Sequence, residues 1–448
     1  MKKKYDVVIL GGGNAGFGAS KVLATAGKKL AFVEPNEFGG TCPNRGCTPK
    51  KVLVAAAHSL DEISRASHHS IEVGPARLDW QALIQRKDEM IGFIPGAMRG
   101  VADKRGDVYV GQARFVGPNQ VQVGEDTIEA EHILVATGSK PRPLSFPGSE
   151  HLVTSAEVLS SPTLPKKAVF IGGGVIALEF GHVYARAGVD VTILEVAPRL
   201  LPRLDADTVA QLHQYSESLG IKVFTGVKVQ AIEGAGSALS VVYEHDGKSQ
   251  RVDSDWVVNG AGRVANVSEL DLAAAGVEHD GVRIAVNQQL QSVSNPSVWV
   301  AGDALVGSAQ LSPIATYEGQ VVGRNIAHNA AEAPDYFALP SAVFTVPSLA
   351  TVGLTEEEAQ KQYPKLRVTT NDMSTWFSGK SYGEKLAWAK VLIDDASDTI
   401  VGAHLLGHNA DDLIHVFCLA MKHKISVTAL KNQIFAFPSF SSDIKSLL

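Results

Sequence analysis

The sequence predicts an α/β protein with two similar strand–turn–helix–strand units and a final α+β domain. The pattern begins near residue 5 and returns near residue 168. Later in the chain, segments 342–345 and 387–393 read as strands and segment 411–423 reads as a helix. The length of 448 residues fits two to four domains, because a domain usually has about 100–200 residues.

Charge and hydropathy make several kinds of partner improbable for this chain. The net charge is -6, which gives no reason to expect a nucleic-acid partner. No apolar stretch approaches the ~20 residues that a membrane helix needs. We therefore expect a soluble, cytoplasmic protein with no nucleic-acid or membrane partner.

The first unit carries a glycine motif between two apolar runs, residues 5–10 and 30–34. Its glycines are Gly11, Gly13 and Gly16. The first permits a tight turn, the second lets the backbone approach a pyrophosphate, and the third lets helix and strand pack closely. The free N–H groups of the following helix favour phosphates, and Glu34 ends the second strand, where an acid can bind ribose hydroxyls. This unit is therefore predicted to be a Rossmann-like dinucleotide site.

The second unit repeats the motif with Gly172, Gly174 and Ala177, and its terminal acid is Glu195. A carboxylate at that position accepts hydrogen bonds from a free 2′-hydroxyl and repels a 2′-phosphate, which favours NAD over NADP. NADP stays possible, because Arg199 and Arg203 follow closely and an arginine can meet a phosphate. Two units need two dinucleotides, and one bound FAD with one exchanging nicotinamide nucleotide would meet this need.

Cys42 and Cys47 follow the first unit directly, at the start of a predicted helix. A helix N-terminus lowers the pKa of a thiol and favours the reactive thiolate. The only other cysteine is Cys418, and three cysteines are too few for a disulfide framework. A redox-active pair is the favoured interpretation; two structural cysteines are the alternative, and a metal site would need a further ligand.

Residues 39–51 resemble the redox segment of the pyridine nucleotide–disulfide oxidoreductases, the group of glutathione reductase, dihydrolipoamide dehydrogenase and mercuric reductase. Four later segments resemble, in order, the family's second flavin motif, its return from the NAD domain, its late flavin motif and the opening of its dimerisation domain. They are residues 136–141, 260–266, 300–304 and 351–356.

The resemblance covers essentially the whole chain and implies a homodimer with three domains. They are an FAD-binding domain of residues 1–145 and 266–335, an NAD(P)-binding domain of residues 146–265 and a dimerisation domain of residues 336–448.

The resemblance also implies a role for individual residues. Cys42 would attack a substrate disulfide and Cys47 would be the charge-transfer thiol facing the flavin. Lys50 and Glu179 match an ion pair beside the flavin. The residues expected to bind FAD or NAD(P) are Gly11, Gly13, Gly16, Glu34, Gly40, Thr41, Ala113, Thr137, Gly138, Asp303, Gly172, Gly174, Ala177, Glu195 and Gly262.

The chain departs from the family pattern near its C-terminus. Phe437 stands where the family's disulfide reductases carry a catalytic histidine from the partner subunit, and Ser442 replaces a nearby glutamate. Phenylalanine cannot carry a proton, and losing a positioned base typically costs about 10²–10⁴-fold in rate. Lys21 and Gln320 replace two arginines of the glutathione pocket, which weakens the expectation of a glutathione substrate.

The leading prediction is transfer of electrons from NAD(P)H through FAD to the cysteine pair and on to a disulfide or related oxidised sulfur compound. A reductase of a non-thiol acceptor, such as a quinone, a metal species or oxygen, is the runner-up, and a non-catalytic redox-sensing module is a third class. No metal site is predicted, because the C-terminal histidines read as packing or surface residues. They are His404, His408, His415 and His423.

Overall fold

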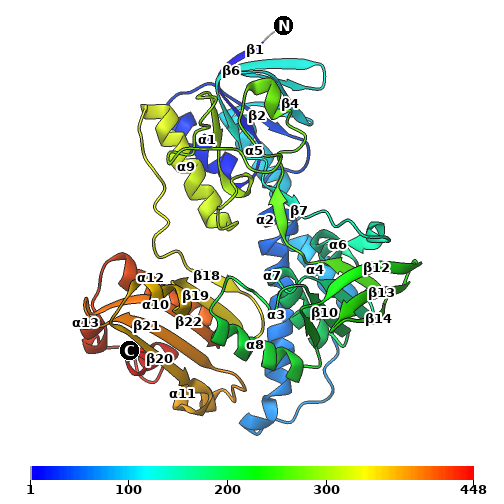
Figure 1. Cartoon of the computed structure of the whole chain (residues 1–448), viewed down its shortest axis with the longest axis vertical. Coiled ribbons are helices and arrows are strands. Elements are labelled where there is room, and N and C mark those ends of the chain that lie inside the picture. Colours follow the sequence, from blue (N-terminus) through cyan, green and yellow to red (C-terminus); the bar gives the residue numbers. More distant parts are fainter. Residues whose placement is uncertain (1–2) are drawn as a thin grey trace. The chain divides into compact units, whose positions relative to one another are not determined.

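The computed structural model describes residues 3–448, so residues 1 and 2 of the predicted FAD-binding domain lie outside the described residues. The chain forms two compact units (Figure 1). The first unit holds the chain up to residue 50 together with residues 85–143 and 262–335. The second holds residues 51–84, 144–261 and 336–448. Across residues 3–448, no helix combines the length and apolar character needed to cross a membrane.

The first unit is built on a mixed sheet in the order β3-β2-β1-β6-β5-β4, with β17 also paired to β6. Strand β1 is parallel to both β2 and β6, and it pairs Val7 with Leu30 and with His132. The apolar runs of β1 and β2 are almost fully buried, as expected for central parallel strands. The strands are β1 (Lys3–Leu10), β2 (Leu30–Glu34), β3 (Gly106–Val110), β4 (Ala113–Gly117), β5 (Gln120–Val123), β6 (Asp126–Val135) and β17 (Val298–Val300).

Two helices of this unit, α1 (Asn14–Thr25) and α9 (Ser312–His328), lie side by side with their backbones unusually close (Figure 1). A Cβ atom at Gly18 would lie 2.3 Å from the carbonyl oxygen of Thr316, and one at Gly319 would lie 2.1 Å from that of Ala15. Only glycine fits at these two positions. The contact fixes where α9 begins relative to the first glycine loop.

The second unit contains a parallel sheet in the order β11-β10-β9-β15-β8. Strand β9 (Lys167–Ile171), helix α7 (Val175–Arg186) and strand β10 (Asp190–Glu195) form the second predicted strand–turn–helix–strand unit. The other strands of this sheet are β8 (Leu152–Val153), β11 (Lys222–Thr225) and β15 (Trp256–Asn259). Strands β12 (Lys228–Ala235), β13 (Ala238–His245) and β14 (Lys248–Ser254) form a small antiparallel sheet beside it.

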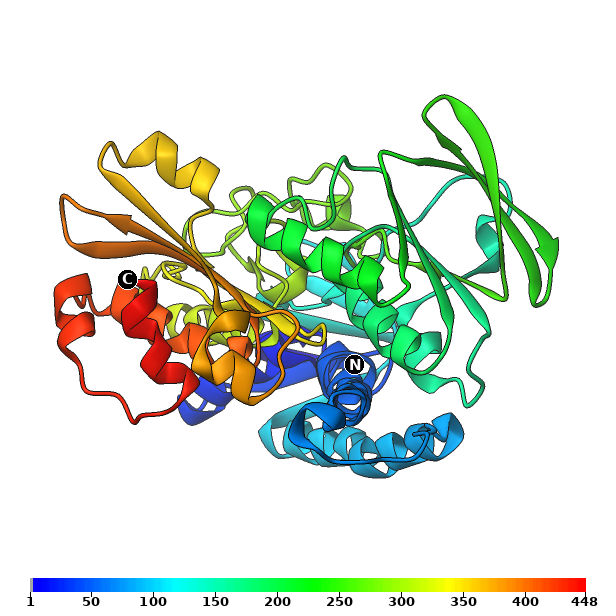
Figure 2. The ribbon, with the colours of Figure 1, turned by 90° about the horizontal axis from the view of Figure 1, so that it is seen from below.

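The C-terminal part of the second unit is an antiparallel sheet in the order β18-β19-β22-β21-β20 (Figure 2). Helix α12 (Ala410–Lys422) packs on β19 and β22. This arrangement confirms the α+β domain expected after residue 340. The strands are β18 (Ser341–Val343), β19 (Ser348–Gly353), β20 (Leu366–Asp372), β21 (Trp388–Asp394) and β22 (Thr399–Gly407).

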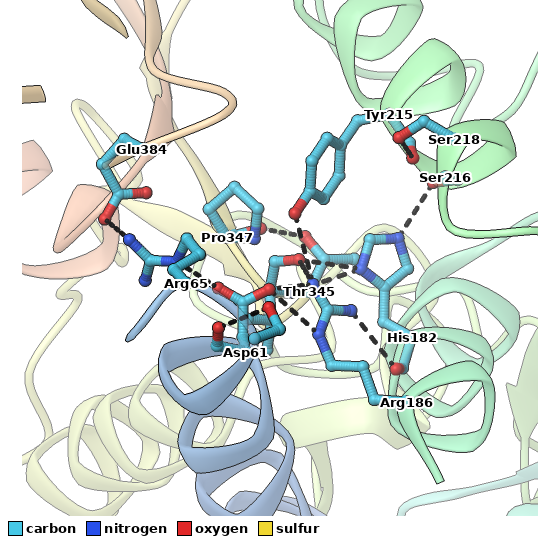
Figure 3. A network of polar contacts seen from close by, with 12 residues as sticks. Asp61, Arg65, His182, Arg186, Tyr215, Ser216, Ser218, Thr345, Pro347 and Glu384 are labelled. Carbon is cyan, nitrogen blue, oxygen red and sulfur yellow. Dashed lines mark hydrogen bonds and ion pairs between the residues drawn. The ribbon is translucent and has the colours of Figure 1, made fainter. Parts of the chain in front are cut away.

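A buried polar network ties helix α3 (Cys47–Ser64) to α7 and to the chain before β19 (Figure 3). Asp61 of α3 accepts hydrogen bonds from Arg186 of α7 at 2.8 Å and from Arg65 at 3.0 Å. Arg186 also donates to the carbonyl oxygen of Val346 at 2.6 Å, and Arg65 pairs with Glu384 at 3.0 Å. Because α3 begins at Cys47, the network anchors the end of the helix that lies opposite this cysteine.

Candidate active site

The two cysteines belong to the first unit and lie on consecutive helical segments. Cys42 belongs to the short helix α2 (Thr41–Arg45), and Cys47 is the first residue of α3. Gly46 joins them, and a Cβ there would lie 2.9 Å from the carbonyl oxygen of Thr41. The chain therefore turns tightly between two free thiols.

The two sulfurs share a hydrogen bond and differ in charge. The bond from Cys42 lowers the pKa of the Cys47 thiol to about 6, helped by the Ser312 hydroxyl and by the positive charge of Lys50. The same bond, together with burial, raises the pKa of Cys42. The proton therefore stays on Cys42, while Cys47 is a thiolate above about pH 6 and loses its charge as the pH falls through that value. The role predicted for Cys47, charge transfer to the flavin, stays a prediction.

The first glycine loop has the form of a phosphate cradle. Gly11 has φ +117°, and a Cβ there would lie 2.2 Å from the carbonyl oxygen of Ala136. A Cβ built on Gly13 would meet no atom nearer than the Cα of Gly40, at 3.7 Å, so these two predicted residues face each other without side chains. At Gly16 a Cβ would lie 2.2 Å from the carbonyl oxygen of Gly11, which makes the close turn into α1 possible only for glycine.

Glu34 braces this loop through both carboxylate oxygens. Oε2 accepts the backbone N–H of Gly12 at 2.7 Å, and Oε1 accepts that of Asn36 at 2.9 Å. The hydroxyl of Thr137 is buried and has no hydrogen-bond partner within residues 3–448. Buried polar atoms are nearly always paired, so this oxygen is available to a bound group. The cradle and the unpaired hydroxyl together fit the flavin dinucleotide that the motifs predict.

Three further segments of the family resemblance meet in the same unit. Asp303 accepts a hydrogen bond from the Ser139 hydroxyl at 2.8 Å, and Arg263 donates to that hydroxyl at 2.8 Å. The carbonyl oxygen of Gly138, whose φ is +72°, accepts the N–H of Asn266 at 2.9 Å. Strands β7 (Ser139–Pro141) and β16 (Arg263–Ala265) pair antiparallel there. Of the remaining predicted residues in this unit, Thr41 opens α2, Ala113 opens β4 and Gly262 precedes β16.

The second glycine loop lies in the second unit. Gly172 has φ +103°, and a Cβ there would lie 2.5 Å from the carbonyl oxygen of Gly260. A Cβ on Gly174 would lie 3.6 Å from the same oxygen, and Ala177 is fully buried on α7. The Glu195 carboxylate accepts the N–H groups of Gly173 and of Ala197, the latter at 2.6 Å. This loop therefore repeats the bracing seen at Glu34.

The two arginines that keep NADP possible as the reductant, Arg199 and Arg203, have different surroundings. Arg199 donates to the carbonyl oxygens of Leu201 at 3.1 Å and of Pro202 at 2.6 Å, so its guanidinium is committed to the local backbone. Arg203 lies exposed in the same loop.

The remaining predicted catalytic residues lie on different elements. Lys50 is in the first turn of α3, and Glu179 is buried on α7, where it accepts the N–H of Phe344 at 2.8 Å. The ion pair expected between Lys50 and Glu179 stays a prediction. Phe437 is 83% exposed and Ile434, just before it, is 86% exposed, so this segment presents large apolar side chains to its surroundings.

Two of the C-terminal histidines, His404 and His408, have local partners. His404 bonds to the Thr351 hydroxyl at 2.6 Å, while His408 pairs with Glu384 at 3.3 Å and stacks on Phe440. Over residues 3–448, no three His, Cys, Asp or Glu side chains gather in a way that could hold a metal ion.

Ser312 belongs to the site but is not predicted by the sequence. Its hydroxyl lies 3.4 Å from the Cys47 sulfur. Ser-Pro at a helix start is a recognisable signal, because proline suits the first turn. That signal gives the start of α9, but it does not show that this start lies beside a cysteine 265 residues earlier in the chain.

Comparison with known proteins places the whole chain in one family. Residues 5–319 match the model described as pyridine nucleotide-disulphide oxidoreductase, and residues 339–448 match that family's dimerisation domain. A dihydrolipoyl dehydrogenase of Chlamydia muridarum is 31% identical, over 98% of this chain and 95% of its own. A mitochondrial dihydrolipoyl dehydrogenase of Arabidopsis thaliana is 32% identical, over 98% and 89%.

Among solved structures, the Cu(II) complex of the HOCl-induced flavoprotein disulfide reductase RclA from Escherichia coli has a TM-score of 0.89. It is 26% identical and covers 100% of this chain and 99% of its own. Cradle, cysteine pair and relatives agree: the chain belongs to the pyridine nucleotide-disulphide oxidoreductases and is an FAD-dependent oxidoreductase that acts on a sulfur group with NAD(P)H.

Proposed function

We propose that this enzyme carries two electrons from NADH through FAD to the Cys42–Cys47 disulfide and on to a disulfide or related sulfur acceptor, as a cytoplasmic homodimer. The observation that supports this proposal is the single proton that the Cys42 and Cys47 sulfurs share. A hydride brings two electrons and one proton, and a reduced pair with one thiol and one thiolate holds the same content.

The residues of the first glycine loop, with Thr137 and Asp303, would hold FAD. When bound, FAD would supply the two-electron link between the nicotinamide and the cysteine pair. The N-terminus of α1 suits a pyrophosphate, because a Cβ built on Gly13 would meet no atom nearer than 3.7 Å and the backbone of the loop is therefore open to a close approach. The unpaired Thr137 hydroxyl would gain a hydrogen-bond partner.

The cysteines would perform the exchange in two steps. Cys42, after losing its proton to solvent, attacks one acceptor sulfur; the acceptor S–S bond breaks, and one acceptor thiol leaves with a proton. The Cys47 thiolate then attacks the Cys42 sulfur, re-forms the intramolecular disulfide and releases the second acceptor thiol, which also takes up a proton. Overall, one NADH and one proton convert one disulfide to two thiols.

Phe437 limits which acceptors react well. No side chain at that position can give a proton to the departing thiolate, so the acceptor must leave without help. A leaving thiol of low pKa departs faster in such an exchange. We therefore expect aromatic disulfides to react faster than glutathione disulfide, for which Lys21 and Gln320 also offer poor recognition.

NADH is the favoured reductant, because the carboxylate beside the second glycine loop suits a ribose whose 2′-hydroxyl is free. The Glu195 carboxylate would repel a 2′-phosphate. Arg199 is engaged by the carbonyl oxygens of Leu201 and Pro202 and so has little freedom to offset that repulsion.

Reduction of Cu(II) is a second candidate. The related reductase RclA is described as a Cu(II) complex, and sulfur ligands suit copper in its reduced state. Two Cu(II) ions would take one electron each from the reduced pair, yielding two Cu(I) ions, the Cys42–Cys47 disulfide and one proton released from Cys42. This transfer needs no acid at Phe437.

Anaerobic reduction of the holoenzyme by NADH or NADPH, with thiol counting, tests the proposal. We expect NADH to be faster and to produce two additional free thiols together with long-wavelength thiolate-to-flavin absorbance. Cys42→Ser should abolish disulfide reduction, whereas Cys418→Ser, the matched control, should not. Unchanged thiol counts after NADH, with flavin bleaching alone, would contradict a disulfide relay. Copper reduction that survives Cys42→Ser would remove the second candidate.

A further inference from the structure

We propose that Lys390 of the dimerisation domain is a positioning residue for the nicotinamide nucleotide, because it anchors the loop that lies on the second glycine loop. This segment, residues 196–204, is called the cover loop below. The inference rests on the proposed function only in taking the second glycine loop as the nucleotide site. It assigns a role in nucleotide binding to a residue that lies far along the chain from both glycine motifs.

Lys390 is a buried cation in contact with three carboxylates. It lies on β21 and is 1% exposed. Its ammonium lies 3.2 Å from Asp205, 2.5 Å from Asp207 and 2.6 Å from Glu356. Asp207 is in the first turn of helix α8 (Ala206–Ser218). Because a buried charge is costly unless it is paired, the lysine and its carboxylates hold one another in place.

Asp205 connects this lysine to the cover loop. It directly follows the loop, is 2% exposed and is the N-cap residue of α8. Its Oδ1 accepts the backbone N–H of Thr208 at 3.1 Å, and its Oδ2 accepts a hydrogen bond from Lys390 at 3.2 Å. Both carboxylate oxygens are therefore engaged, so the C-terminal end of the cover loop has little freedom to shift.

The middle of the cover loop lies directly on the second glycine loop. A Cβ on Gly173 would lie 2.4 Å from Cδ2 of Leu200, which is fully buried. Leu201 donates its N–H to the Gly173 carbonyl oxygen at 3.2 Å. Leu201 also has φ +40°, a conformation that a leucine keeps only where its surroundings hold it. The cover loop is thus fitted to the backbone that would hold the nucleotide phosphates.

The cover loop is held at both ends. The preceding end is fixed by Glu195, which accepts the N–H groups of Gly173 and Ala197. The following end is fixed by Lys390 through Asp205. A loop that is already ordered when the nucleotide arrives spares binding the free energy of ordering it. Removing the lysine should therefore weaken nucleotide binding and leave the hydride-transfer step unchanged.

Binding of ADP-ribose to the oxidised holoenzyme tests the role of Lys390. ADP-ribose carries the adenosine and pyrophosphate of NADH without the nicotinamide, so isothermal titration calorimetry measures binding without electron transfer. Lys390→Met removes the ammonium, and we expect a Kd about 10-fold higher than in the wild type. Lys361→Met is the matched control in the same domain, because it breaks only an exposed pair with Glu357 and should bind like the wild type.

A second variant guards against misfolding of the first. Lys390→Met leaves the Asp205 carboxylate buried without its lysine, which can destabilise the fold. Combining it with Asp205→Asn removes that charge and keeps the helix cap, because asparagine caps helices as well as aspartate does. The double variant should show the same increase of about 10-fold in the Kd for ADP-ribose.

Flavin reduction by NADH in stopped flow gives a second readout. The half-saturating NADH concentration should rise by about the same factor in both variants, while the limiting reduction rate stays within about twofold of the wild type. A merely structural role for Lys390 would lower the urea midpoint and leave both binding measurements unchanged.

An unchanged Kd for ADP-ribose in the double variant would overturn the proposal, whatever its urea midpoint. A Kd raised as much in Lys361→Met would also overturn it, because the effect would not depend on the contact with Asp205. Failure of the wild type to bind ADP-ribose would remove both this proposal and the nucleotide site. A failed thiol relay in the wild type would contradict the proposed function alone and leave the binding comparison valid.

Discussion

At the scale of single residues, the sulfurs of Cys42 and Cys47 differ because they share one proton. Cys47 carries the charge at neutral pH, while the pKa of Cys42 is raised by its bond to Cys47 and by burial. Yet Cys42 is the sulfur predicted to attack the acceptor. Its deprotonation is therefore the step that a neighbouring base would otherwise assist.

The pH dependence of disulfide exchange follows from that difference. A thiol with a raised pKa becomes a thiolate only as the pH rises, so the rate of acceptor reduction by the wild type should increase from pH 7 to about pH 9 without levelling off. Stopped-flow mixing of the prereduced enzyme with an aromatic disulfide measures this. A rate that is flat over the range would show that another group already removes the proton.

Restoring a base at position 437 should change that profile. Phe437→His places an imidazole where the family carries one, and we expect about a 10-fold or larger gain at pH 7, with a flatter profile above neutrality. Phe437→Leu is the matched control, because it keeps an apolar side chain and should behave like wild type. An unchanged rate in the histidine variant would mean that this position does not reach Cys42.

Local motifs identify much of the site but not Ser312. The glycines, Glu34 and Cys42 belong to short segments whose backbone requirements are visible in the sequence. Ser312 meets Cys47 only because α1 and α9 pack together. Such a contact between distant segments has no local signature.

At the scale of elements, the contact of α1 with α9 can be tested by adding one methyl group. Gly319→Ala would place a Cβ 2.1 Å from the Ala15 carbonyl oxygen, so one helix must move. We expect a loss of about 2–4 kcal/mol in the free energy of unfolding and weaker FAD retention. Urea titration and flavin fluorescence measure the two effects.

Gly181→Ala on α7 is the matched control. Its Cβ would meet Val191 at 3.6 Å and Ile193 at 3.7 Å, which are ordinary contacts. Because alanine suits a helix better than glycine, this variant should be more stable by about 0.5–1 kcal/mol. Equal behaviour of the two alanine variants would contradict the close approach of α1 and α9.

The buried polar network that joins α3 and α7 gives a second prediction at this scale, about the stability of the fold. Arg186→Met removes one of the two arginine partners of Asp61 and the donor to Val346, while the Asp61 carboxylate stays largely buried and keeps Arg65. We expect a loss of about 3 kcal/mol in the free energy of unfolding, measured by urea titration. Arg251→Met breaks only the exposed pair with Glu233 and should leave the unfolding midpoint almost unchanged.

At the scale of the whole molecule, repeated strand–helix–strand patterns predict most of the fold. Both strand–helix–strand units and the final α+β region are found where the sequence predicts them. The sequence does not show as readily which segments of the chain pack together in one compact unit. Val52 of α3, Tyr184 of α7 and Leu406 of β22 share one core, which places residues 51–84 and 336–448 in one compact unit with the second glycine loop. Composition cannot show which apolar faces meet.

Substitutions in the exposed C-terminal segment test whether the chain forms a dimer. The match to a dimerisation domain predicts a particle of twice 47.5 kDa in sedimentation velocity. Ile434→Asp should weaken the dimer, because a charge would replace an 86%-exposed apolar side chain that we expect at the interface. Val110→Asp, which alters a 65%-exposed apolar residue of the first unit, should leave the mass unchanged.

The glycines between α1 and α9 have a consequence for genetic variation. Gly18 and Gly319 place backbone against backbone, so any amino-acid substitution there adds atoms where none fit. In a library that varies every codon, these positions should be as intolerant as Cys42. The reason would differ: variants of the cysteine would accumulate as intact, inactive flavoprotein, whereas variants of the glycines would disappear from the yellow protein fraction altogether.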